Sequence, residues 1–196
     1  MPNTSATGGY LIPSVTPAPA EDLALEDIMQ PAIAGITGIT ATNVRPRFQE
    51  GNPKIPDQSI DWCAFSITMQ TPDANPYLEH DPAGNGKSTL IRHEDFELFI
   101  SFYGYNAAMN AARLRDGFYI NQNSEKINAQ EIAFVDAGEI RLAPELVNQK
   151  WIRRNDLRMK FRRKITRDYA IENILAADVH LFDATGHVDE LIVISE

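Results

Sequence analysis

The segment 151–167, WIRRNDLRMKFRRKITR, constrains the fold more than any other stretch of the chain. Apolar and charged residues alternate along it, and alternation over this length is typical of a strand with one buried face. The apolar set is Trp151, Leu157, Met159, Phe161 and Ile165, and the charged set is Arg154, Asp156, Arg158, Lys160, Arg162 and Lys164. In a helix, successive members of the apolar set would point in different directions. We therefore expect a long strand that buries the apolar set.

This basic strand lies in an acidic protein. The segment 151–167 holds eight Arg and Lys residues against one Asp, whereas the whole chain carries a net charge of −9 and has a pI near 4.9. That balance argues against a general nucleic-acid binder, which is usually basic over its whole domain. The charged face of the strand therefore needs an anionic neighbour or open water, and the sequence leaves both open.

Periodicity predicts helices between the strands. Apolar residues at helical spacing favour a helix at 21–36, which Pro31 should kink or restart and which Gly35 and Gly38 should close. An alanine-rich stretch predicts a second helix at 105–116, and a polar stretch at 121–130 predicts a short third one.

Alternating or continuous apolar runs predict the remaining strands. These runs are 42–48, 61–70, 88–104, 131–143, 171–183 and 188–194. We expect a strand or a hairpin at 131–143, and we expect 171–183 to be the antiparallel partner of the basic strand. Residues 71–86 are expected to form a long loop that ends in a hairpin turn at Asn85-Gly86, and Thr185-Gly186 predicts another turn.

The elements together favour an α+β fold, with a mostly antiparallel twisted sheet and helices packed on one of its faces. We expect an extended N-terminal arm at 1–20, the α+β domain at 21–184, and a C-terminal strand or arm at 185–196. Both terminal segments carry apolar residues that suit docking on another surface. These docking residues are Tyr10, Leu11, Ile12, Leu191 and Val193.

Two short motifs suggest chemistry, but neither has the residues that the chemistry needs. The run Asn85–Thr89 resembles the end of a phosphate-binding loop, yet Asp81 stands where the motif requires glycine. The group His93–Asp95 lacks a second histidine at paired spacing, so a solvated face of mixed charge is expected rather than a metal site. Cys63, the single cysteine, lies in an apolar run and is expected in the core. We therefore expect neither enzyme activity nor a cofactor or metal, and no apolar run is long enough to span a membrane.

A series of short motifs follows the same order along the chain as in one known family. The series is Gly38–Thr40, Val44–Pro46, Trp62 at the start of a strand, His93–Leu98, Leu114–Gly117, and Trp-x-x-Arg-x-Asp-Leu from Trp151 to Leu157. Over residues 22–183 the chain resembles the neck or tail terminator proteins of tailed bacteriophages.

The resemblance implies a structural virion protein that forms a hexameric ring, caps the tail tube, ends tail growth and joins the tail to the head connector. The implied partners are further copies of the chain, the tail tube protein, a sheath protein, and a connector or adaptor protein, with genomic DNA passing through the lumen. The implied location is the neck of the virion, and the host cytoplasm during assembly. Arg154, Arg158, Lys160, Arg162 and Lys164 would then face a neighbouring subunit, the lumen, or water.

Three alternatives to this function remain. The chain could be another tail or connector component of a phage or a phage-like injection machine. It could be a soluble nucleic-acid-binding module that uses residues 151–167, in which case the free monomer should bind DNA with a steep salt dependence. It could also be a small enzyme built on Lys87 or on His93–Asp95, in which case the pure protein should hydrolyse nucleotides above background.

Overall fold

The computed structural model of the chain describes residues 3–49, 51, 54–57, 59–147, 149–173, 176–182 and 188–195. The helices are α1 (Leu23–Thr37), α2 (Ala107–Gly117) and α3 (Asn121–Asn128), with a short 3-10 turn η1 at Ala41–Asn43. The strands are β1 (Val44–Pro46), β2 (Trp62–Pro72), β3 (Tyr77–Asp81), β4 (Lys87–Tyr103), β5 (Ile132–Ala137), β6 (Arg141–Leu142), β7 (Glu145–Val147), β8 (Lys150–Ile152), β9 (Arg154–Tyr169), β10 (Ala176–Phe182) and β11 (Val188–Ser195).

One sheet organises most of these strands. Its order is β1-β2-β4-β9-β5, while β3 pairs with β4 and β6 pairs with β9. The pairings of β2 with β4, and of β5 and β6 with β9, are antiparallel, whereas β1 runs parallel to β2. Two further hairpins, β7–β8 and β10–β11, form separate two-stranded sheets. The α+β class with a mostly antiparallel sheet is therefore confirmed.

The chain forms two compact units, which we describe separately. One unit contains Pro19–Pro76 and Ile91–Ile165, and the other contains Met1–Ala18, Tyr77–Leu90 and Thr166–Glu196. The expected division into arm, domain and C-terminal strand remains a prediction.

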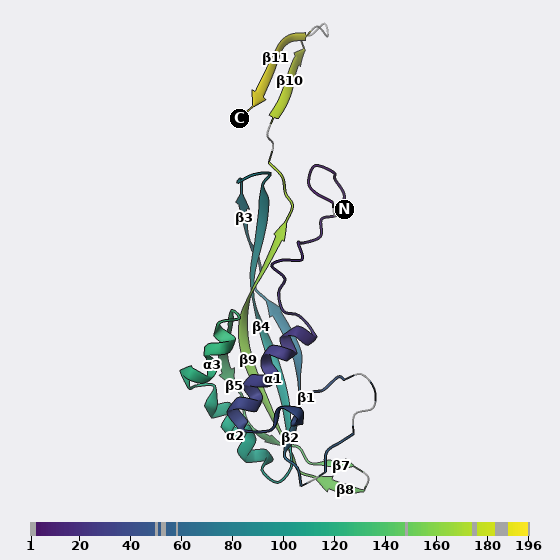
Figure 1. The fold of residues 1–196 in the computed structure, drawn as a ribbon, viewed down its shortest axis with the longest axis vertical. Helices are drawn as coiled ribbons and strands as arrows, with labels where there is room; N and C mark the ends of the chain where they lie inside the picture. Colours follow the sequence, from purple (N-terminus) through teal and green to yellow (C-terminus); the bar gives the residue numbers. More distant parts are fainter. Residues whose placement is uncertain are drawn as a thin grey trace. The chain divides into compact units, whose positions relative to one another are not determined.

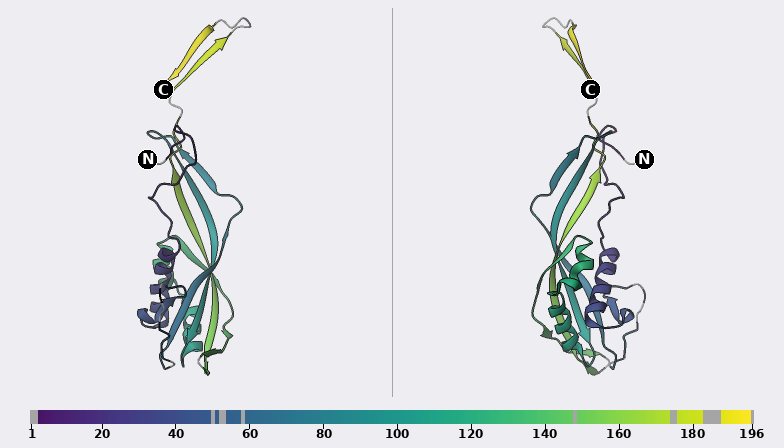
Figure 2. Two further views of the ribbon diagram at one scale, coloured as in Figure 1. Left: turned by 90° about the vertical axis from the view of Figure 1, so that its right-hand side faces the viewer. Right: turned by 60° about the vertical axis from the view of Figure 1, so that its left-hand side comes forward.

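In the unit that contains the helices, α1, α2 and α3 cover one face of the sheet (Figures 1 and 2). Residues of α1 at spacing four, Leu25, Met29 and Ile33, are fully buried, because this spacing puts them on one side of the helix. The sheet meets them with alternate residues of β4 and β9, as period two requires. These are Phe96, Leu98, Ile100, Phe102, Leu157, Met159 and Phe161, each at most 1% exposed. The hydrophobic core therefore lies between the helices and this face.

In the other unit, the described part of the N-terminal arm lies against the end of β9. The amide of Ser14 donates to the carbonyl of Asp168, and the amide of Ser5 donates to the carbonyl of Ala170. Residues 3–20 form neither helix nor strand. At the start of β4, Lys87 pairs with Asp168 at 3.6 Å. The strands β10 and β11 pair antiparallel with each other.

Most of the expected elements are confirmed, with shifted ends. The helix α1 continues through Pro31 and Gly35 as one element, and Gly38 ends it in the left-handed conformation at φ 80°. The helices α2 and α3 and the strands β2 and β4 match their predicted ranges closely. At 131–143, where a strand or a hairpin was expected, the strand alternative is confirmed, since β5 and β6 each pair with β9 rather than with each other.

Two predictions about connectivity are wrong. Residues 71–86 are not a long loop, because β2 continues to Pro72 and β3 forms a hairpin with the first half of β4. The turn between β3 and β4 does use Asn85-Gly86, with Gly86 at φ 87°. The expected pairing of 171–183 with the basic strand is wrong for its described strand, because β10 pairs with β11, while β4 and β5 flank β9. The turn predicted at Thr185-Gly186 lies outside the described residues.

Candidate interaction surface

The face of the sheet opposite the helices carries ion pairs between β4 and β9. Asp95 and Glu97 of β4 share the strand parity that points away from the core. Lys160 Nζ lies 2.8 Å from Asp95, Arg162 lies 3.0 Å from the same carboxylate, and Arg158 pairs with Glu97. Donation by Lys160 and Arg162 holds the pKa of Asp95 below its usual value. The basic strand thus meets carboxylates of its own chain.

Residues outside β4 pair with the basic side chains in the second half of β9. Arg162 also reaches Asp73 at 2.6 Å, and Lys164 reaches Glu131 at 2.8 Å. With these contacts, each predicted cation from Arg154 to Lys164 on the charged face has a carboxylate partner. We call this set the ion-pair ladder: Asp73, Asp95, Glu97, Glu131, Glu145, Arg154, Asp156, Arg158, Lys160, Arg162 and Lys164.

Arg154 donates three hydrogen bonds to carboxylates within the ladder. It donates two hydrogen bonds to Asp156, at 2.7 and 2.9 Å, and one to Glu145 at 3.3 Å. Ser101 donates to the same Asp156 carboxylate at 2.7 Å. The two-pronged contact with Asp156 raises the pKa of the Arg154 guanidinium above its usual value.

A buried ion pair on the opposite side of β9 was not foreseen. Arg163 is 4% exposed, and its guanidinium lies 2.6 Å from Glu94, which is 7% exposed. The same guanidinium donates to the backbone carbonyl of Ala20, just before α1. The prediction of a solvated face at His93–Asp95 is therefore wrong for Glu94, and Asp95 belongs to the ladder. The alternation of β9 held the signal, since position 163 shares the parity of Met159 and Phe161.

The hairpin β7–β8 exposes a tryptophan between two cations. Trp151 is 69% exposed, so the prediction that it shares the buried face of the basic strand is wrong. The reason is that Trp151 belongs to β8, which pairs only with β7 among the described strands, and not to β9. Lys150 and Arg153 are exposed as well, and neither makes an ion pair with a described residue.

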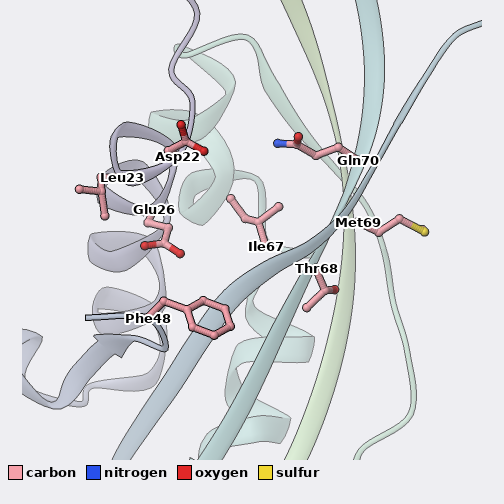
Figure 3. Close-up of a pocket in the computed structure, with 8 residues that line it drawn as sticks. All are labelled: Asp22, Leu23, Glu26, Phe48, Ile67, Thr68, Met69 and Gln70. Atoms are coloured by element: carbon pink, nitrogen blue, oxygen red, sulfur yellow. The ribbon is translucent and has the colours of Figure 1, made fainter. Parts of the chain in front are cut away.

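A groove of about 390 Å³ separates the start of α1 from β2 (Figure 3). Leu23 and Phe48 line it and are 67% and 76% exposed, and Ile67 points toward α1. Asp22 and Glu26 add two carboxylates. Partial burial, with Asp27 and Asp22 nearby, raises the pKa of Glu26. Within the part of the chain that the structure describes, no cation pairs with either groove carboxylate.

The predicted docking residues of the arms are only partly described. Tyr10 and Ile12 are 96% and 63% exposed, and Leu11 is half-buried. Leu191 and Val193 lie in β11, but their side chains fall outside the described residues. Docking of these residues on a neighbouring subunit stays a prediction.

No group of three or more His, Cys, Asp or Glu residues in the described ranges is arranged to hold a metal ion. Ser88 belongs to the run that resembles a phosphate loop, but it lies in β4 rather than at the start of a helix. Cys63 is buried as expected, and burial raises the pKa of its thiol to about 12. Among the described helices, none has the length and apolar character needed to cross a membrane.

Comparison with known proteins identifies one family. Residues 23–185, well over half of the chain, match the model of a family described as phage neck terminator protein. The matched range begins at the first residue of α1 and agrees with the region in which the ordered motifs lie. No curated protein matches the chain.

Proposed function

The chain belongs to the phage neck terminator family, and from this premise we propose that six copies close into a ring that caps the tail tube at the phage neck. A structural role in the phage tail or neck follows from the family itself. In the proposal, the ring ends tail growth and joins the tail to the head connector. Its neighbours are the tail tube protein, a sheath protein where the tail has one, and a connector or adaptor protein. Assembly takes place in the host cytoplasm.

The family match over residues 23–185 is the observation that carries the proposal. The surface described above supports it, because a closed ring needs two different complementary patches on each subunit. An acidic, apolar groove and a basic, aromatic hairpin are two such patches. A structural ring also requires no catalytic group.

The ion-pair ladder is proposed to face a neighbouring subunit or the lumen. Its five cations already contact six carboxylates of the same chain, so the face has little net charge. Tight DNA binding depends on unpaired cations that release counterions from phosphates. A lumen lined by the ladder would therefore let genomic DNA pass without gripping it. The same pairing argues against the alternative of a nucleic-acid-binding module built on residues 151–167.

The terminal arms are proposed to order on a neighbouring subunit through Tyr10, Leu11, Ile12, Leu191 and Val193. The exposure of Tyr10 and Ile12 supports this role, since apolar side chains of an extended segment gain by docking. A chain that lacks residues 1–13 should keep its folded units and assemble less well.

The test combines native mass spectrometry with negative-stain imaging of the full chain, alone and mixed with tail tubes. The expected result is a closed ring at one end of each tube, together with tubes that stop growing once the protein is added. Tubes incubated with an unrelated acidic protein of similar size provide the control. A chain that remains monomeric and never associates with tubes would contradict the proposal.

A further inference from the structure

We propose that the β7–β8 hairpin of one copy docks in the groove between α1 and β2 of the next copy, with Trp151 inserted and Lys150 and Arg153 facing Asp22 and Glu26. The proposal rests on the proposed ring, and it identifies the two patches through which neighbouring subunits meet.

Charge complementarity is the first argument. The groove presents Asp22 and Glu26 without a cation partner among the described residues, and Arg153 beside the hairpin has no carboxylate partner among them. Lys150 makes no ion pair with a described residue, although its charge acts on the carboxylate of Asp57. The ladder cations, in contrast, already have partners. Opposite charges left unpaired on two patches of one subunit favour pairing between copies.

The apolar parts of the two patches also match. Leu23 and Phe48 line the groove and are mostly exposed, and Trp151 exposes most of its surface on the hairpin. Tryptophans that become buried are frequent anchors of protein interfaces. The groove volume of about 390 Å³ accommodates an indole ring. Docking would shield all three side chains from water.

The backbone beside the groove can accept an extended segment. β1 pairs with β2 through Cys63, Ala64 and Phe65, whereas β4 pairs with β2 as far as Pro72. From Ser66 onward, β2 therefore has a described ladder partner on one side only. A strand edge of this kind binds extended segments such as β7 or β8 through main-chain hydrogen bonds.

The arrangement suits a ring rather than a two-fold dimer. Within this unit, Figures 1 and 2 show the hairpin at the end away from the start of α1. Contact between two different and separate patches leaves each subunit with one free groove and one free hairpin until the ring closes.

Cysteine cross-linking in the full chain tests the contact. One chain carries Leu23→Cys and a second carries Trp151→Cys, and the native Cys63 is fully buried and does not compete. Mixed and oxidised, with and without tail tubes, the two chains should give a disulfide-linked dimer that neither chain gives alone. The control replaces Trp151→Cys with Leu142→Cys, because Leu142 is equally exposed, at 68%, but lies on β6.

The outcomes separate this inference from the proposed function. Rings that form without the Leu23–Trp151 cross-link would overturn the inference and leave the ring standing. A cross-link from Leu23→Cys to a tail or connector protein, or an equal cross-link with Leu142→Cys, would also overturn it. The absence of rings both in solution and on tubes would overturn the proposed function, and the inference with it.

Substitutions measure how much the contact contributes. Trp151→Ala should weaken subunit association by about 30-fold, the effect of losing an interface anchor, whereas Leu142→Ala should leave it unchanged. Arg153→Glu should weaken association, and Glu26→Arg in the same chain should restore part of it, since the charge pair is then reversed. Equal association of Trp151→Ala and the unaltered chain would contradict the docking.

Discussion

The basic run of this chain splits into two regions that use their charges differently. In β9, the cations at 154, 158, 160, 162 and 164 each lie against a carboxylate of the same chain. In the hairpin next to it, Lys150 and Arg153 have no such partner among the described residues. The two regions follow each other in the sequence.

The difference comes from the neighbouring strands. β9 lies beside β4, which alternates Asp95 and Glu97 with apolar residues and so presents carboxylates at the spacing of the cations. The hairpin strand β8 has only the three-residue strand β7 beside it in the described sheets. The charge of a segment therefore does not show whether its side chains are free to bind another molecule until the neighbouring strand is known.

The largest expected effect concerns the buried pair of Arg163 and Glu94. Arg163→Met leaves Glu94 buried without a partner and should lower the free energy of unfolding by about 3–5 kcal/mol. Urea denaturation followed by circular dichroism measures the change. The double variant Arg163→Met, Glu94→Leu should recover most of the loss, because no charge is then left in the core. A single variant as stable as the unaltered chain would mean that water reaches this pair.

Arg154 should come next, since its side chain is 22% exposed and its guanidinium makes three hydrogen bonds to carboxylates. Arg154→Gln should lower the free energy of unfolding by about 1.5–3 kcal/mol, the usual value for a hydrogen-bonded charge. The adjacent Arg153→Gln is the matched control and should have little effect. Equal losses of unfolding free energy for the two variants would contradict the view that the ladder cation is paired and that Arg153 is not.

Acid should weaken the ladder before it affects the hairpin. The pKa of Asp95 in the folded chain lies below its unfolded value because Lys160 and Arg162 donate to the carboxylate. A group whose pKa is lower in the folded than in the unfolded state stabilises the fold when the pH lies above its unfolded-state pKa. This stability is lost as the pH falls through the folded-state pKa. Below about pH 4 the unaltered chain should therefore lose stability more steeply than Asp95→Asn. Thermal melts across this range measure the slopes, with Glu79→Gln, an exposed site on β3, as the control.

Much of the fold could be predicted from periodicity, and the errors have physical causes. The alternation of 154–165 correctly separates Leu157 and Phe161 from Arg158 and Arg162, because a strand has only two faces. The same alternation fails at Trp151, since β8 ends at Ile152 and a separate strand, β9, begins at Arg154. Pairing partners could not be predicted, because the contacts of β9 with β4 and β5 join segments far apart in the sequence.

The candidate surface was predictable in part for a related reason. The cations of β9 are evident in the sequence, but their carboxylate partners depend on the register of β4. The groove was not predictable, because it joins the start of α1, Phe48 and the middle of β2. A signal for Arg163 was present, since an arginine at a core position of a strand implies a buried counter-ion.

The hairpin should show the smallest effect on stability. The double variant Lys150→Gln, Arg153→Gln removes two exposed cations that hold no ion pair with the described residues. Its free energy of unfolding should therefore stay within about 0.5 kcal/mol of the unaltered value, as surface substitutions usually do. In the ladder, the matched variant Arg158→Gln, Lys160→Gln removes two paired cations, and its loss should shrink as salt is added, because salt screens exposed pairs. Urea denaturation at low and high ionic strength compares the two. A hairpin variant that loses as much stability as the ladder variant, with the same salt dependence, would show that Lys150 and Arg153 are paired within the subunit and are not available to a second copy.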